Sequence, residues 1–359
     1  MLDQSRIEFA DVPTETRPLL VVVVDTEEEF DWSRPLSREN TSVTSLDAQR
    51  RAQEIFARYG VVPTYVVDYP VAVEEKAVRV LSEFLADAVG EIGAHLHPWV
   101  NPPHEEAVTP YNSYAGNLPA ELERAKLECL TETIEASFGL RPTIYRAGRF
   151  GVGPATAGIL EDLGYRVDAS IVPRTSFAAD GGPNFNGFAA KPYWFGRRGK
   201  LLELPVTAGF AGALAGWGPW AFPALIGALG MKLHAPGVAA RLGLLERIRL
   251  TPEGGDYAAL RRLTRSLLGQ GCRIFSLTYH SPSLEPGRTP YVRDRNDLRG
   301  FLETMDRYLD AFVNDLGGRP TTITELYRLL AEVRETSGRA AKSAAERADS
   351  AQPSAPAGS

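Results

Sequence analysis

Short β-branched segments alternate with longer helical stretches along most of this chain of 359 residues. Such alternation is typical of βαβ units, in which successive strands run parallel and the helices form right-handed crossovers. It predicts a parallel α/β sheet, either open or closed into a barrel. Strands are expected at Leu19–Val24, Val61–Val66, Glu91–His95, Thr143–Arg146, Tyr165–Asp168 and Cys272–Thr278, with a short one near Thr321. Helices are expected at Ser45–Tyr59, Val73–Ala88, Leu118–Phe138, Pro154–Leu163, Asp256–Leu268, Asp294–Val313 and Glu325–Val333.

Two segments interrupt this alternation. The pair Lys191–Phe195 and Leu201–Val206 is expected to form a β-hairpin. An insertion at 207–252 follows, and its residues 209–231 carry no charge but contain two tryptophans. Because prolines interrupt this stretch, we expect it to pack over the sheet rather than to span a membrane. A lid, or a surface for an apolar substrate tail, is the functional alternative.

The ends of the chain and its overall composition narrow the class of protein. Residues 1–16 are interpreted as an N-terminal extension, 17–335 as the folded unit, and 336–359 as a disordered tail rich in small and charged residues. The net charge of −6 provides no basic surface for nucleic acid. Two cysteines form no disulfide framework, and the first residues lack an apolar leader. A cytoplasmic location is therefore expected, with peripheral contact to the inner membrane through 209–231 as an option.

Metal-binding and acid–base side chains follow two of the expected strands. Asp25-Thr26-Glu27 ends the first strand, and His95-Leu96-His97 ends the third. Residues i and i+2 of a strand share one face, so each segment directs two such side chains toward one point. Neutral imidazoles are good zinc ligands, and a cation relieves the repulsion between two carboxylates. One carboxylate could then bind the metal while the other takes a proton from water, which predicts a metal-dependent hydrolase.

Arg146 and His280 also follow strands. Since the carboxyl ends of parallel strands meet at one edge of the sheet, we expect them near the same point. An arginine there can hold a buried carboxylate, for which Asp25 is the natural partner. A histidine that titrates near neutrality can protonate a leaving group. His104 is a fallback metal ligand, and His234 in the insertion is expected to be incidental.

With these motifs in order, the chain resembles the polysaccharide deacetylases of the NodB homology type, known as carbohydrate esterase family four, and among them the WalW-like group. The resemblance covers residues 17 to 333 and implies a distorted (β/α)7 barrel that is open at one side. It implies that Asp25 is the catalytic base and Glu27 the metal-binding carboxylate. His95 and His97 match the two metal histidines, so the implied cofactor is a divalent metal, first of all Zn²⁺.

The remaining motifs extend the resemblance to the rest of the site. Arg146 matches the arginine that tethers the base, and His280 matches the histidine that acts as the acid. Asp168, and Leu204 with Pro205, match positions that line the substrate groove. Trp99 stands where many relatives with HxxxH spacing have their second histidine, and we expect it to contact substrate.

The implied reaction is metal-assisted removal of an N-acetyl group from a carbohydrate, with an N-acetylated glycan as the substrate. Many relatives have Asp-Asp where this chain has Asp-Thr-Glu, and small secreted relatives lack the apolar insertion. Two alternatives therefore remain open. One is a deacylase of a lipid-linked sugar at the inner membrane face, and the other is a catalytically silent barrel that binds glycans.

Overall fold

The computed structural model describes residues 7–13, 15–227 and 232–350, with side chains described up to residue 339. Three parts of the predicted organisation lie outside these residues: 1–6 and 14 of the N-terminal extension, 228–231 of the insertion, and 351–359 of the expected tail.

The centre of the molecule is a ten-stranded sheet with the order β1-β7-β8-β6-β5-β4-β3-β2-β11, in which β12 also pairs with β2. The strands from β6 to β11 along this order pair in parallel, whereas β7 pairs antiparallel with both β8 and β1. The predicted hairpin is thus β7–β8. The strands are β1 (Glu8–Phe9), β2 (Leu19–Thr26), β3 (Thr64–Val67), β4 (Glu91–Leu96), β5 (Ile144–Ala147), β6 (Val167–Asp168), β7 (Tyr193–Phe195), β8 (Leu201–Glu203), β11 (Ile274–His280) and β12 (Arg319–Pro320).

The α/β alternation is confirmed, but the distorted (β/α)7 barrel, open at one side, is not. The order of the described strands is a linear path from β1 to β11, and no pairing within the described residues joins those two ends. The antiparallel β7 and β1 extend one edge away from the parallel region, so that edge cannot repeat the βαβ geometry that closes a (β/α) barrel.

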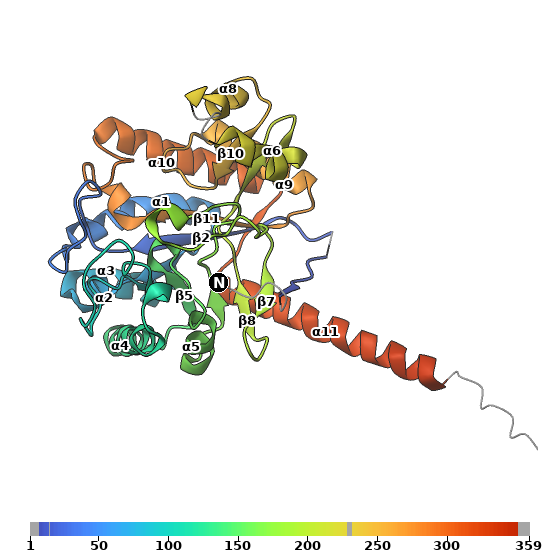
Figure 1. The fold of residues 1–359 in the computed structure, drawn as a ribbon, viewed down its shortest axis with the longest axis horizontal. Coiled ribbons are helices and arrows are strands. Elements are labelled where there is room, and N and C mark those ends of the chain that lie inside the picture. Colours follow the sequence, from blue (N-terminus) through green and yellow to red (C-terminus); the bar gives the residue numbers. More distant parts are fainter. Residues whose placement is uncertain (1–6, 14, 228–231, 351–359) are drawn as a thin grey trace, which may run out of the picture.

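Helices wrap around the outer face of the sheet (Figure 1). They are α1 (Gln49–Tyr59), α2 (Tyr69–Val73), α3 (Glu75–Ala86), α4 (Ala120–Phe138), α5 (Thr156–Leu163), α9 (Tyr257–Gly269) and α10 (Arg295–Asp310). The last helix, α11 (Ile323–Ser350), instead contributes buried residues to the other face of the sheet. Local capping explains several boundaries. Asp256 and Asp294 accept hydrogen bonds from the first-turn N–H groups of α9 and α10, and α1 ends at Gly60 with a φ of 66°.

The alternation of side chains along strand β2 determines which face Asp25 lies on. Its even residues Leu20, Val22 and Val24 belong to the large core beneath the outer helices. Its odd residues Leu19, Val21 and Val23 belong to a second, inner core that also contains Ile323 and Leu326 of α11. Since side chains alternate along a strand, Asp25 continues the inner row at the carboxyl end of β2.

The insertion forms a small unit beside α9 and α10 (Figure 1). It consists of β9 (Ala208–Ala211), α6 (Gly218–Leu225), α8 (Ala235–Arg241) and β10 (Glu246–Arg249), with β9 and β10 paired antiparallel. Its base is joined to β11, because Thr278 N–H donates to the Leu250 carbonyl at 3.1 Å and Ser276 N–H donates to the Thr207 hydroxyl at 2.7 Å. No helix in the described residues is long and apolar enough to cross a membrane.

Residues 336–350 of the expected tail continue α11, which projects away from the body of the molecule (Figure 1). The predicted disorder of 336–359 stays a prediction. The composition that suggested disorder includes many alanines with glutamate, lysine and arginine, which are also good helix formers.

Candidate active site

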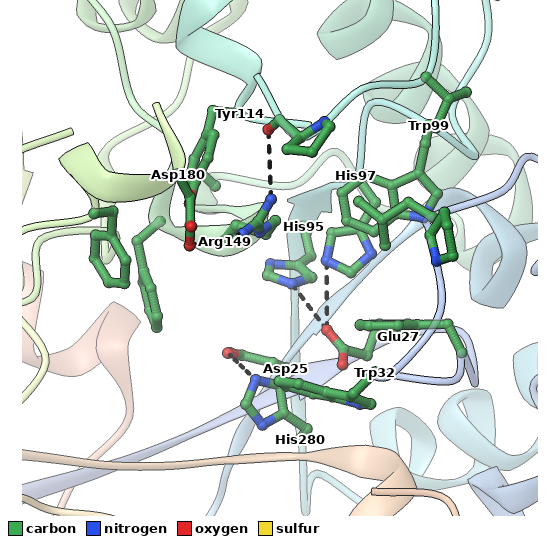
Figure 2. A pocket seen from close by; sticks show the side chains of 18 of the residues that line it. Asp25, Glu27, Trp32, His95, His97, Trp99, Tyr114, Arg149, Asp180 and His280 are labelled. Atoms are coloured by element: carbon green, nitrogen blue, oxygen red, sulfur yellow. Dashed lines mark hydrogen bonds and ion pairs between the residues drawn. The ribbon is translucent and has the colours of Figure 1, made fainter. Parts of the chain in front are cut away.

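A cavity of about 560 Å³ lies at the carboxyl ends of β2, β4, β5 and β11. Figure 2 shows the polar side chains that face one another across it. The parallel arrangement explains why residues far apart in sequence meet here, since these strands all end at the same edge. The wall contains Asp25, Glu27, His95, His97 and His280.

Glu27, His95 and His97 converge on one point. The Nε2 atoms of both histidines lie 3.4 Å from Oε2 of Glu27, and all three side chains are buried. Burial raises the pKa of Glu27 to about 7 and lowers the pKa of His97 to about 4, and it also lowers the pKa of His95. The two imidazoles are therefore neutral at neutral pH, as metal ligands must be.

Hydrogen bonds orient both rings toward that point. His95 Nδ1 lies 3.0 Å from the Arg146 carbonyl oxygen, which can only accept, so Nδ1 carries the proton and Nε2 keeps its lone pair. His97 Nδ1 lies 2.7 Å from Glu28 Oε2, so this ring too directs its Nε2 toward Glu27. Two imidazole nitrogens and one carboxylate oxygen form a donor set that fits a divalent metal such as zinc.

A second layer of buried groups supports His97. The Trp99 indole N–H donates to Glu28 Oε1 at 2.8 Å, and its ring stacks on His97 with centroids 4.3 Å apart. The backbone N–H of Glu28 donates to Asp68 Oδ2 at 2.7 Å. Burial raises the pKa of Glu28 to about 7 and, together with the neighbouring Glu28, raises that of Asp68 well above its usual value.

Asp25 is tethered by a buried arginine, as expected for Arg146 from the sequence. Arg146 Nη1 donates to Asp25 Oδ1 at 2.5 Å and to the Thr278 hydroxyl at 2.6 Å, while Nε donates to the Ala169 carbonyl at 2.9 Å. Burial alone would raise the pKa of Asp25, but the charges of Arg146 and His280, with the hydrogen bond from Arg146, outweigh it and lower the pKa below the usual value. Asp25 is thus an ionised carboxylate.

His280 lies across from Asp25, with its Nε2 3.9 Å from Asp25 Oδ2. The Nδ1 atom of His280 lies 2.9 Å from Glu253 Oε2. The other carboxylate oxygen of Glu253, Oε1, accepts hydrogen bonds from the His280 backbone N–H and from the Ser283 hydroxyl. Burial would lower the pKa of His280, but Glu253, Glu27 and Asp25 together raise it to about 10. His280 is therefore a cation at neutral pH, which suits a proton donor.

Aromatic rings form the outer wall of the cavity. Trp32 is 40% exposed and packs edge to face on His280, with ring centroids 5.3 Å apart. Tyr291 lies parallel to the same imidazole, with ring centroids 6.4 Å apart, and also packs edge to face on Trp32, with centroids 5.8 Å apart. Such half-exposed aromatic faces can pack against the apolar face of a sugar ring while polar groups orient its substituents.

The turn after β5 brings further groups to the wall. A Cβ at Gly148 would lie 2.2 Å from Cδ2 of His97, so only glycine allows this approach. Arg149 and Phe150 follow with φ angles of 52° and 59°, which are uncommon for residues with side chains. Both line the cavity, and the Arg149 guanidinium lies 4.4 Å from the centre of the Tyr114 ring.

Of the three predicted substrate contacts, Asp168 and Leu204 do not line the cavity, whereas Trp99 does. Asp168 is fully buried and does not line the cavity. It pairs with Tyr145 of β5, whereas the next residue of β5, Arg146, is the one that pairs with His95. Asp168 therefore lies one residue farther from the carboxyl end of the sheet than Arg146 and His95. Leu204 is 1% exposed and belongs to the inner core. Trp99 borders the cavity, but it is 1% exposed and its one polar atom is bonded to Glu28.

The remaining two histidines lie elsewhere. His104, the fallback ligand, is exposed and does not line the cavity, and His234 is exposed next to α8.

Sequence reasoning missed several residues of the site. Glu28 directly follows Glu27, and nothing in its spacing distinguishes it from Glu29. Arg249 comes from the insertion and Tyr291 from the loop after β11, and both line the cavity. Glu253 follows the insertion and reaches the site through its bonds to His280. These approaches depend on tertiary packing alone.

Comparison with known proteins supports the fold. No family model and no curated protein matches the chain. A solved structure of a provisionally named polysaccharide deacetylase from Mycobacterium smegmatis is 17% identical, covers 91% of this chain and 95% of its own, and has a TM-score of 0.50. The chain has the fold of that protein.

Two further solved structures align less closely. The peptidoglycan deacetylase PdaC from Bacillus subtilis is 10% identical, with 92% of this chain and 99% of its own covered and a TM-score of 0.42. A carbohydrate esterase family four pseudoenzyme from Bacillus anthracis is 12% identical, with coverages of 87% and 66% and a TM-score of 0.41.

Proposed function

We propose that this chain is a metal-dependent hydrolase that removes an acyl group, typically acetyl, from the nitrogen of an amino sugar. The observation that carries the proposal is the convergence of three kinds of group in one cavity. They are a neutral two-histidine, one-carboxylate cluster, an ionised Asp25 held by Arg146, and a cationic His280 only 3.9 Å from Asp25. A purely structural role would not require all three together.

In this mechanism, Glu27, His95 and His97 would hold the divalent metal, with zinc as the first candidate. When bound, such a cation supplies Lewis acidity toward the amide carbonyl and lowers the pKa of water. Asp25 accepts the proton of the attacking water, and Arg146 keeps Asp25 ionised until then. His280 donates its Nε2 proton to the departing amine, and Glu253 fixes the ring through Nδ1. Trp32 and Tyr291 would orient the sugar ring.

The test separates metal binding from turnover. Glu27→Ala and His95→Ala are expected to lose stoichiometric metal, measured by elemental analysis of the purified protein. Asp25→Asn is expected to keep the metal and to lose acetate release from a panel of N-acetylated glycans by at least about 100-fold, the scale of one general base. Full acetate release by Asp25→Asn would contradict the proposal. Stoichiometric metal in the wild type without acetate release from any glycan would instead favour a silent glycan-binding protein.

One observation favours a lipid-linked sugar as the substrate. Trp217 and Trp220 of the insertion are 71% and 83% exposed, and residues 204–245 contain no carboxylate but two cations, Lys232 and Arg241. Exposed tryptophans beside basic residues suit the interface of an anionic bilayer. Flotation with anionic phospholipid vesicles tests this, with Trp220→Ser expected to reduce binding. Equal flotation of the variant, or none by the wild type, would leave a soluble glycan as the substrate.

A further inference from the structure

Arg249 ends strand β10 of the insertion and lines the active-site cavity, as does Phe150, over whose ring its guanidinium lies. Its Cζ lies 5.5 Å from the centre of the Phe150 ring, and in the part of the chain that the structure describes this side chain makes neither a hydrogen bond nor an ion pair. The backbone holds it in place, since Arg249 is paired with Ala208 of β9 and the next residue is bonded to β11.

The other charged groups of this wall have partners. Asp25 is bonded to Arg146, Arg149 lies 3.7 Å from Asp180, Arg34 lies 3.1 Å from Asp31, and His280 is bonded to Glu253. Glu27 faces the two imidazoles. Among the described residues, Arg249 is therefore the cation of the cavity wall that lacks a carboxylate of its own.

An arginine in this position is poorly solvated. Burial lowers the pKa of Arg249, and the attraction of Tyr291, Glu253 and Asp25 offsets this effect only in part. A partly desolvated cation without a partner is costly, and the cost is recovered when an anion binds to it. Guanidinium is well suited to that task, because its planar N–H groups match a carboxylate or phosphate in pairs.

We propose that Arg249 binds an anionic substituent, a carboxylate or a phosphate, of the sugar whose N-acyl group is removed in the same cavity. This inference rests on the proposed function and narrows its substrate to acidic amino sugars. It also gives the insertion 207–252 a role, since β10 carries the selective residue to the cavity while the reacting groups come from the central sheet.

The test measures kcat/KM for acetate release from N-acetylmuramic acid, N-acetylglucosamine 1-phosphate and neutral N-acetylglucosamine oligomers. The wild type is expected to prefer at least one anionic sugar by about 10- to 100-fold, the range for one charge-assisted hydrogen-bonded pair. The two anionic sugars distinguish a carboxylate from a phosphate. In Arg249→Gln the ratio of anionic to neutral kcat/KM should fall about tenfold or more, and Arg249→Lys should retain part of it. The matched control is Arg262→Gln, because Arg262 is an exposed arginine bonded to Glu246 of the same strand, at 2.7 Å.

A second readout keeps the outcome clear if turnover fails. Calorimetry measures the affinity of the same sugars for the folded wild type and for Arg249→Gln. The anionic sugar should bind the variant about tenfold more weakly than it binds the wild type. Metal-dependent acetate release with no preference for either anionic sugar would overturn the inference and leave the proposed function intact. Absence of acetate release from every sugar would overturn the proposed function, and equal binding of anionic sugars by wild type and variant would then overturn the role of Arg249 as well.

Discussion

Replacement of Glu253 by glutamine tests whether His280 is held as a proton donor by this one carboxylate. Glu253 Oε2 lies 2.9 Å from His280 Nδ1, and Glu253 provides the largest upward contribution to the pKa of His280, which is about 10. Two charges at roughly 4 Å in an effective dielectric constant of about 20 interact by about 4 kcal/mol, equivalent to about 3 in pKa. Glutamine still accepts the Nδ1 hydrogen bond, so the pKa of His280 in Glu253→Gln is expected to fall to roughly 7 to 8.

The linkage to stability has a definite sign. Because the pKa of His280 is higher in the folded protein than the usual 6.5, protonation stabilises the fold below pH 6.5, and this contribution is lost as pH rises toward 10. The deficit of Glu253→Gln in unfolding free energy should therefore be larger at pH 6 than at pH 10, by roughly 3 kcal/mol.

The direct assay is an NMR titration of the His280 ring in metal-free protein, combined with urea denaturation at the two pH values. Glu246→Gln is the control, since Glu246 lies on the neighbouring strand β10 but is bonded to Arg262 at the surface. If His280 in Glu253→Gln still titrated near pH 10, or if the stability deficit did not depend on pH, the carboxylate would not be what keeps this histidine charged.

Two further substitutions test the support of the site. Glu28→Gln should weaken metal binding by about 10- to 100-fold in a chelator competition, because Glu28 orients His97 through Nδ1. The control Asp31→Asn, at an exposed position, should not change metal affinity, and equal affinities of the two variants would contradict the role of Glu28. Arg146→Met leaves Asp25 buried without its cation and should lower the free energy of unfolding, measured in urea, by about 3 to 5 kcal/mol. Adding Asp25→Asn should recover part of this loss, and a loss below about 1 kcal/mol would refute the buried pairing.

The groups that sequence reasoning could bring together are those fixed by strand geometry. Asp25, His95, Arg146 and His280 each follow an apolar run, and parallel strands end at one edge, so their convergence needs only the α/β alternation and the two-residue period. The tether from Arg146 to Asp25 follows from the same geometry and simple charge pairing. The far edge of the sheet could not be deduced in this way, because it depends on how β7 and β1 pair there.

The substrate contacts were predicted less well, since they depend on depth within the sheet and on the paths of loops. Asp168 pairs with Tyr145, one residue before Arg146, so it lies inside the sheet rather than at the carboxyl end where the cavity begins. Because β6 is only two residues long, a shift of one residue in register is enough to decide this. Trp99 was predicted to contact substrate, but its indole N–H donates to the buried carboxylate of Glu28. No periodic pattern marks Glu253 or Arg249, because the contacts that bring them to the cavity join segments far apart in sequence.

This division suggests that chemistry and selectivity are carried by different parts of the chain. The proposed metal-binding and acid–base groups are fixed by β2, β4, β5 and β11, whose packing leaves little freedom for change. Arg249 belongs instead to an insertion whose base is joined to β11 through Leu250 and Thr207. A change at the tip of β10 can therefore alter the charge that faces the substrate without moving Glu27, His95 or His97. Selectivity for an acidic or neutral sugar can vary in such a fold while the hydrolytic centre stays the same.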